Sequence, residues 1–133
     1  MKKKRIIKPP KKIGGSFVAS YDTDLKGLAT LMSIKNFRGV YDLNSLPIKP
    51  KRIEEAIVRI NGDHWVCYIK NGKYVNYFNS IGNKPPPIKL QNYLKNLEIS
   101  WNKKRYQRRG TSYCGYLCLL FLKEILYKEV PPQ

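Results

Sequence analysis

The sequence is poor in acidic residues, histidine and cysteine. Nine Asp and Glu stand against 26 Lys and Arg, so the formal net charge at neutral pH is +17. Such an excess predicts salt-sensitive affinity for polyanions, of which DNA and RNA are the commonest. The three cysteines are an odd number, which excludes a framework built only of paired disulfides and favours a reducing compartment.

Long apolar runs are also absent. The longest, residues 116–122, is far shorter than the roughly 20 residues that cross a bilayer. The basic start runs into Pro9 and Pro10 rather than an apolar block, so we expect no secretory signal and no membrane contact. The 133 residues suit one domain.

Two clusters of basic residues are candidates for nucleic-acid binding. The first belongs to residues 1–15, interpreted as a basic flexible arm ahead of a single domain at 16–133. A solvated tail is an equally good interpretation of that arm. The second cluster precedes the last predicted helix. The members are Lys2, Lys3, Lys4 and Arg5 in the arm, and Lys103, Lys104, Arg105, Arg108 and Arg109 in the domain.

Periodicity and turn signals predict strands in the middle of the chain and helices on either side. Strands are expected at 56–60, 65–69, 74–78 and 98–101, with a hairpin turn at Asn71-Gly72. Residues 24–33, 88–97 and 114–129 are expected to be helical, and the stretch from 37 to 47 a loop. In the first helix Leu25, Leu28, Leu31 and Met32 are expected on one face.

Catalysis by a thiol needs a base, a group that orients the base, and donors for the oxyanion. His64 is the single histidine, so any Cys–His pair must use it. Counted outward from Asn71-Gly72, Asn79 is expected opposite His64, with Cβ atoms about 5 Å apart. Its amide oxygen is then placed to accept the Nδ1–H of the imidazole. Taken singly, His64 suits a surface or packing role, and Asn79 an ordinary turn.

Cys114 opens the last predicted helix, where backbone N–H groups and the helix dipole favour a thiolate. Gly115 leaves room for a substrate backbone. Cys67 and Cys118 are interpreted as packing residues, and the spacing of Cys114 and Cys118 is not a zinc signature. Gln107 is placed to donate its amide N–H to an oxyanion. In isolation Cys114 suits a core cysteine and Gln107 a solvent-exposed loop.

In this order the residues resemble the adenovirus-protease (adenain-like) family of cysteine endopeptidases, in the clan that also holds the SUMO-deconjugating proteases. The resemblance covers roughly residues 16–127, and its matching elements are His64-Trp65, residues 77–82, Gln107 and residues 114–118. It implies an α+β fold in which a small mixed or antiparallel sheet packs on a buried C-terminal helix. That helix carries the nucleophile of a papain-like site in permuted chain order.

The resemblance also implies a role for each site residue. Cys114 is the expected nucleophile, His64 the general base and Asn79 the group that orients it. Gln107 and the Cys114 backbone N–H are the expected oxyanion hole, and Trp65 and Gly115 line the substrate cleft. No metal is implied.

The family cleaves virion precursor proteins after small, Gly-rich sequences and uses viral DNA as a cofactor. The resemblance therefore implies a monomeric viral endopeptidase of the virion and host nucleus, with virion precursor polypeptides and viral DNA as partners and no membrane. The chemistry itself needs no cofactor, and DNA is a candidate activator. Two departures stand out: Asn79 replaces the usual Asp or Glu, and residues 80–113 lack the cysteine to which an activating peptide is disulfide-linked in adenain.

Two other functions are compatible with the same residues. One keeps the enzyme but changes the substrate to the isopeptide bond of ubiquitin or a ubiquitin-like modifier. The other is a basic nucleic-acid-binding protein without catalysis, in which His64 and Cys114 are incidental.

Overall fold

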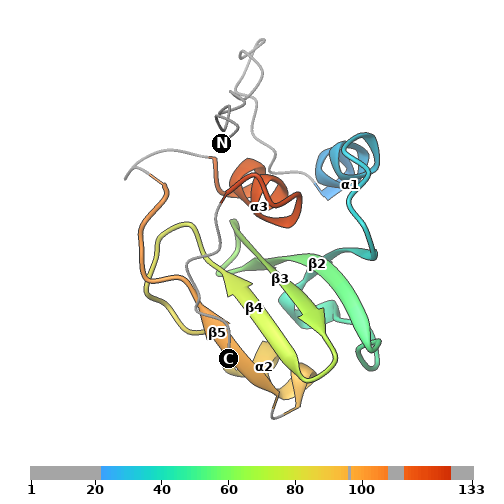
Figure 1. The fold of residues 1–133 in the computed structure, drawn as a ribbon, viewed down its shortest axis with the longest axis vertical. Helices are drawn as coiled ribbons and strands as arrows, with labels where there is room; N and C mark the ends of the chain where they lie inside the picture. Colours follow the sequence, from blue (N-terminus) through green and yellow to red (C-terminus); the bar gives the residue numbers. More distant parts are fainter. Residues whose placement is uncertain (1–21, 96, 108–112, 127–133) are drawn as a thin grey trace, which may run out of the picture.

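The computed structural model describes residues 22–95, 97–107 and 113–126, which form a mixed sheet with helices on both faces (Figure 1). In chain order the elements are α1 (Asp22–Leu31), β1 (Phe37–Asp42), the short 3-10 helix η1 (Leu43–Ser45), β2 (Ile53–Ile60), β3 (His64–Asn71), β4 (Tyr74–Phe78), α2 (Ile88–Leu94), β5 (Glu98–Trp101) and α3 (Cys114–Leu122).

The strands of the described residues lie in one sheet in the order of the sequence, β1-β2-β3-β4-β5. The central strand β3 is antiparallel to both of its neighbours, β2 and β4. The two outer strands run parallel to their neighbours, β1 to β2 and β5 to β4. The mixed sheet and the helix that begins at Cys114 confirm the predicted α+β architecture.

Both faces of the sheet are covered, which explains why its central strands are buried almost throughout. Helices α1 and α3 lie over one face and α2 lies over the other (Figure 1). Side chains alternate along β3: Trp65 and Cys67 pack with α3, whereas Val66 and Tyr68 pack with α2. Two apolar cores therefore hold β3, and with it the start of the strand at His64, in place.

Two expectations about the first half of the chain are wrong. The stretch from 37 to 42 is not a loop but strand β1. It pairs with β2, a segment that lies later in the sequence. In α1, Leu31 is 81% exposed and Ala29 is buried in its place. The stripe that faces the core runs through Leu25, Ala29 and Met32, and Leu31 falls about 240° around the helix from Leu25.

The two later helices are shorter than expected. Helix α2 ends at Leu94, where Lys95 adopts a left-handed conformation with a φ of 50°. Helix α3 ends at Leu122 rather than near 129, and Glu124 has a φ of 65°. The arm at 1–15 lies outside the described residues. In the part of the chain that the structure describes, each helix is too short or too polar to cross a membrane.

Candidate active site

Asn79 holds the imidazole of His64. His64 is the first residue of β3, and Asn79 directly follows β4. The Oδ1 atom of Asn79 lies 2.8 Å from Nε2 of His64. The same oxygen accepts a hydrogen bond from the backbone N–H of Ile81 at 3.1 Å. A backbone N–H can only donate, so this arm of the amide is the oxygen and His64 Nε2 carries a proton. In the neutral ring Nδ1 is then the acceptor.

The predicted contact between His64 and Asn79 forms, but through Nε2 rather than Nδ1 and in a different register of the hairpin. Asn71 pairs with Tyr74, so the loop of the hairpin begins one residue later than expected and the pairing shifts by two. The last pair of the ladder is Cys67 with Phe78. If the same register continues beyond it, Asn79 lies diagonal to His64 rather than directly opposite it. A shift of two residues keeps a side chain on the same face of the sheet, and the contact survives for that reason.

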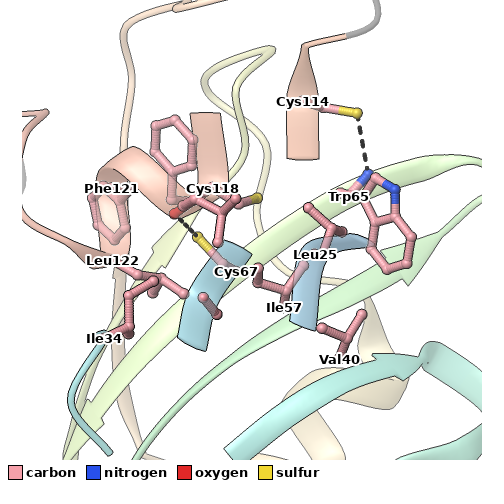
Figure 2. Close-up of a cluster of buried hydrophobic side chains, with 13 residues drawn as sticks. Leu25, Ile34, Val40, Ile57, Trp65, Cys67, Cys114, Cys118, Phe121 and Leu122 are labelled. Carbon is pink, nitrogen blue, oxygen red and sulfur yellow. Dashed lines mark hydrogen bonds between the residues drawn. The ribbon is translucent and has the colours of Figure 1, made fainter. Parts of the chain in front are cut away.

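Cys114 is the first residue of α3 and is buried, with 7% of the residue exposed. The backbone N–H of Trp65 donates to Sγ at 3.5 Å (Figure 2). Burial raises the pKa of Cys114, but hydrogen bonds with His64 and with the N–H groups of Trp65 and Gly115 lower it further than burial raises it. The thiolate is the form that this site stabilises.

The pKa of His64 moves in the opposite direction. Burial of the ring lowers it, but the hydrogen bonds with Cys114 and Asn79 raise it above its ordinary value. Because Nε2 is bound to Asn79, Nδ1 is the nitrogen left for the thiol. A lowered pKa of the thiol beside a raised pKa of the imidazole favours transfer of the proton from Cys114 to His64. The geometry thus favours a thiolate and an imidazolium.

The other two cysteines belong to the core, as expected. Cys67 and Cys118 are fully buried, and the Cys67 thiol donates to the Cys118 carbonyl oxygen at 3.7 Å (Figure 2). Burial and the neighbouring Cys67 thiol raise the pKa of Cys118 well above its ordinary value. Cys118 is therefore unsuited to nucleophilic chemistry.

Gln107 contacts the residue next to Asn79. The hydroxyl of Ser80 donates to Gln107 Oε1 at 2.5 Å, and the Ser80 carbonyl oxygen accepts the backbone N–H of Gln107 at 3.0 Å and that of Tyr106 at 2.8 Å. Residues 108–112, between Gln107 and α3, lie outside the described residues. The structure therefore links Gln107 to the Asn79 side of the site.

Asn102 is a site residue that the sequence analysis missed. Its buried side chain accepts the Asn79 N–H on Oδ1 at 3.0 Å, and its Nδ2 donates to the carbonyl oxygens of Asn79 at 2.8 Å and Lys104 at 2.9 Å. Asn102 follows β5, which is parallel to β4, so the two strands end at the same edge of the sheet. The sequence signal that could have found Asn102 is that an asparagine directly follows each of these two strands, Asn79 after β4 and Asn102 after β5.

The backbone N–H groups of Trp65 and Gly115 hydrogen-bond to the sulfur of Cys114. Trp65 is 2% exposed and packs in the same core cluster as Cys114 and Leu25 (Figure 2). The guanidinium of Arg59 lies 5.6 Å from the centre of the indole ring. Gly115 is the buried second residue of α3. Within the residues described, no cluster of His, Cys, Asp and Glu could hold a metal ion.

The domain's basic cluster begins beside the site. Lys103, Lys104 and Arg105 are exposed. The Lys103 ammonium lies 4.6 Å from the ring centre of Trp101, and that of Lys104 lies 5.3 Å from the ring centre of Tyr106. The remaining candidates for nucleic-acid contact lie outside the described residues: Lys2, Lys3, Lys4, Arg5, Arg108 and Arg109.

The chain was compared with known families, curated proteins and solved structures. No family model matches it, and neither does any curated protein. The ASFV pS273R protease superposes with a TM-score of 0.55 at 16% identity, over 86% of this chain and 63% of that one. The chain has the fold of that protease. This shared fold confirms the adenain-like fold predicted from the sequence. The chain spans less than two thirds of the matched protein's length.

Two structures of the SUMO protease Ulp1 overlap less well. With its catalytic cysteine oxidized to a sulfenic acid, Ulp1 gives a TM-score of 0.44 at 18% identity, over 55% of this chain and 41% of that one. With that cysteine oxidized to a sulfinic acid, the TM-score is 0.42 at 19% identity, over 77% and 50%. These scores are too low to bear on the fold.

Proposed function

We propose that the protein is a cysteine endopeptidase with Cys114 as nucleophile and His64 as general base. The observation that carries this proposal is the chain of contacts from Asn79 through His64 to Cys114, in which the pKa of the thiol is lowered and that of the imidazole is raised. The fold, which is that of a protease, supports it. Asn79 orients the ring as a neutral amide, which suffices where the pair is already ionised.

The reaction has two stages. The Cys114 thiolate attacks the scissile carbonyl carbon, and the His64 imidazolium gives its proton to the leaving amine as the C–N bond breaks. A water molecule then loses a proton to His64 and attacks the thioester, which releases the acid and restores the pair. In both stages the carbonyl oxygen becomes an oxyanion, for which the Gln107 amide and the Cys114 backbone N–H are the donors we propose.

The substrates we propose are virion precursor proteins cut after small, Gly-rich sequences. The likeness to a protease of ASFV supports a viral substrate. We propose that the protein acts as a monomer in the virion and the host nucleus, without a cofactor for the chemistry.

Viral DNA is the second partner we propose. The net charge of +17 favours a polyanion, and the exposed Lys103, Lys104 and Arg105 lie only a few residues before Gln107. DNA bound there lies next to the loop that carries the oxyanion donor, which supports a role as activator. The affinity for DNA should fall steeply with salt.

Selective alkylation tests the nucleophile. In the native protein, iodoacetamide should label Cys114 far faster than Cys67 or Cys118, as read by peptide mass spectrometry, because only Cys114 contacts His64. Cys114→Ala should abolish both the fast labelling and the cleavage of a Gly-Gly peptide reporter, with an unchanged melting temperature. Equal slow labelling of all three cysteines contradicts the proposal.

A panel of substrates tests the specificity. Cleavage of capsid-type Gly-Gly peptides supports the endopeptidase. Cleavage of C-terminal ubiquitin-like reporters alone would assign an isopeptidase instead. A folded protein that binds DNA and cleaves neither class would be a nucleic-acid-binding protein in which the thiol has no catalytic part.

A further inference from the structure

Ser80 is a buried hydroxyl residue that the catalytic roles above do not use. It is 0% exposed, yet its hydroxyl contacts Gln107 and its carbonyl oxygen accepts two backbone N–H groups from the same loop. We propose that Ser80 is a positioning residue that aims the Gln107 side chain at the oxyanion. This inference rests on the proposed function, since it assigns a part to Gln107 in the same reaction.

The chemistry of a primary amide explains how one hydroxyl can do this. The Gln107 amide has an oxygen on one arm and an NH2 group, its only donors, on the other. The Ser80 hydroxyl donates to the oxygen arm at 2.5 Å. Once an oxyanion forms on the far side, only this orientation satisfies both the hydroxyl and the oxyanion. A donor on the oxygen also polarises the amide, which strengthens its N–H groups as donors.

The backbone around Ser80 makes the placement rigid. The Asn102 side chain fixes the backbone of Asn79, and the Ser80 carbonyl fixes the N–H groups of Tyr106 and Gln107. One short segment therefore holds the residue that orients His64 and the residue that donates to the oxyanion. Small displacements of such groups cost much of the rate, so a fixed link between them preserves the geometry of the reaction.

The test separates Ser80's effect on the oxyanion from an effect on the thiol. In Ser80→Ala, kcat for the Gly-Gly reporter should fall roughly tenfold, which corresponds to the loss of one ordinary hydrogen bond. KM, and the pH profile of iodoacetamide alkylation at Cys114, should not change, because alkylation needs the thiolate but forms no oxyanion. Ser100→Ala, on strand β5, is the matched control and should leave kcat unchanged.

A double-mutant cycle shows whether Ser80 acts through Gln107. Gln107→Ala should lower kcat about 100-fold, as the loss of an oxyanion donor does. Adding Ser80→Ala to it should lower kcat no further. The proposal would be overturned if the losses of kcat in the two single variants multiplied in the double variant, or if the pH profile of Cys114 alkylation shifted in Ser80→Ala. If Ser80→Ala does not fold, Ser80→Cys keeps the shape with a weaker donor and is held to the same cycle.

The same measurements distinguish this inference from the proposed function. If Gln107→Ala cleaves normally while Cys114→Ala is inactive, the positioning role is wrong and the cysteine endopeptidase stands. If Cys114→Ala still cleaves the reporter, the proposed function fails and the positioning role fails with it.

Discussion

At the scale of single residues, the candidate site contains one thiol and one imidazole that shift each other's pKa. The pKa of Cys114 is lowered and that of His64 raised, although burial alone acts in the opposite direction on both groups. Hydrogen bonding to the charged forms therefore outweighs desolvation in this pair. The other groups that act on the pair are backbone N–H donors, the Asn79 amide and the charge of Asp63, which also raises the pKa of His64.

The first prediction concerns the reactivity of Cys114 against pH. The thiolate forms as the pH rises through the lowered pKa, so alkylation by iodoacetamide should already be fast well below the ordinary cysteine pKa of about 8.5. His64→Ala removes the strongest of the interactions that lower the pKa and should move the midpoint of the alkylation profile upward. An unchanged midpoint in His64→Ala would show that the ring does not act on the thiol.

A second prediction concerns Asn79. Its hydrogen bond raises the pKa of His64, so Asn79→Ala should lower that pKa and reduce kcat roughly tenfold or more as the ring loses its orientation. Asn79→Asp should raise the pKa of His64 above that of the natural protein, because a carboxylate stabilises the imidazolium more than an amide does.

The chain suits this measurement, because its single histidine gives one unambiguous imidazole signal in an NMR titration. The same pKa in all three proteins would mean that the Asn79 contact does not form in solution.

At the scale of elements, the site depends on two loops in close contact, one after β4 and one after β5. The two loops approach each other closely at Gly82, which has a φ of 88° and where a Cβ would lie 2.7 Å from the Lys104 carbonyl oxygen. Both loops end parallel strands at one edge of the sheet, so their contact sets the distance between Asn79 and Gln107. Without a side chain at Gly82, the backbones can pack directly.

The third prediction compares Gly82→Ala with Gly62→Ala. Gly62 has nearly the same φ, 87°, but nothing lies within 4 Å of its Cβ position. Both changes should cost about 1 kcal/mol for the left-handed backbone. Gly82→Ala should cost clearly more in urea unfolding, and it should also reduce kcat, because Lys104 must move away. Equal losses of stability in the two variants would contradict the close approach.

At the scale of the whole molecule, a buried carboxylate ties four elements together on the face opposite α3. Glu54 of β2 accepts hydrogen bonds from Arg38 of β1 at 2.8 Å, Tyr68 of β3 at 2.6 Å, Tyr93 of α2 at 2.8 Å and the Lys51 N–H at 2.9 Å. Burial raises the pKa of Glu54, but these hydrogen bonds lower it overall. The folded state therefore holds Glu54 ionised.

The fourth prediction is that Glu54→Ala destabilises the fold by about 1–3 kcal/mol, because it leaves two buried tyrosine hydroxyls without their acceptor and removes the ion pair with the partly exposed Arg38. The lowered pKa of Glu54 also determines how the stability of the fold changes with pH. Glu54 contributes its stability above the ordinary value of 4.5, and this is lost as the pH falls through the lower folded value. Melting curves below pH 4.5 should show a weaker pH dependence in Glu54→Gln than in the natural protein.

Much of the fold could be predicted from local patterns, and its errors have physical causes. The strands at 74–78 and 98–101 have the predicted ends, because the first is a mainly apolar run after a turn and the second alternates polar and apolar residues. Strand β1 was missed because Arg38 and Gly39 interrupt its apolar pattern, and the partner that makes it a strand lies elsewhere in the chain. The hairpin register was misjudged because Asn71 continues the ladder instead of forming the turn.

By itself the sequence determined which groups could react: a single histidine forces every thiol mechanism through His64, and Cys114 is the cysteine that begins a helix. Only the tertiary structure decided which ring nitrogen Asn79 binds and which side chains fix Asn79 and Gln107. Such hydrogen bonds depend on tenths of an ångström between residues far apart in the chain. Those distances follow from the packing of α3 on β3 and the parallel pairing of β4 with β5, which no local pattern encodes.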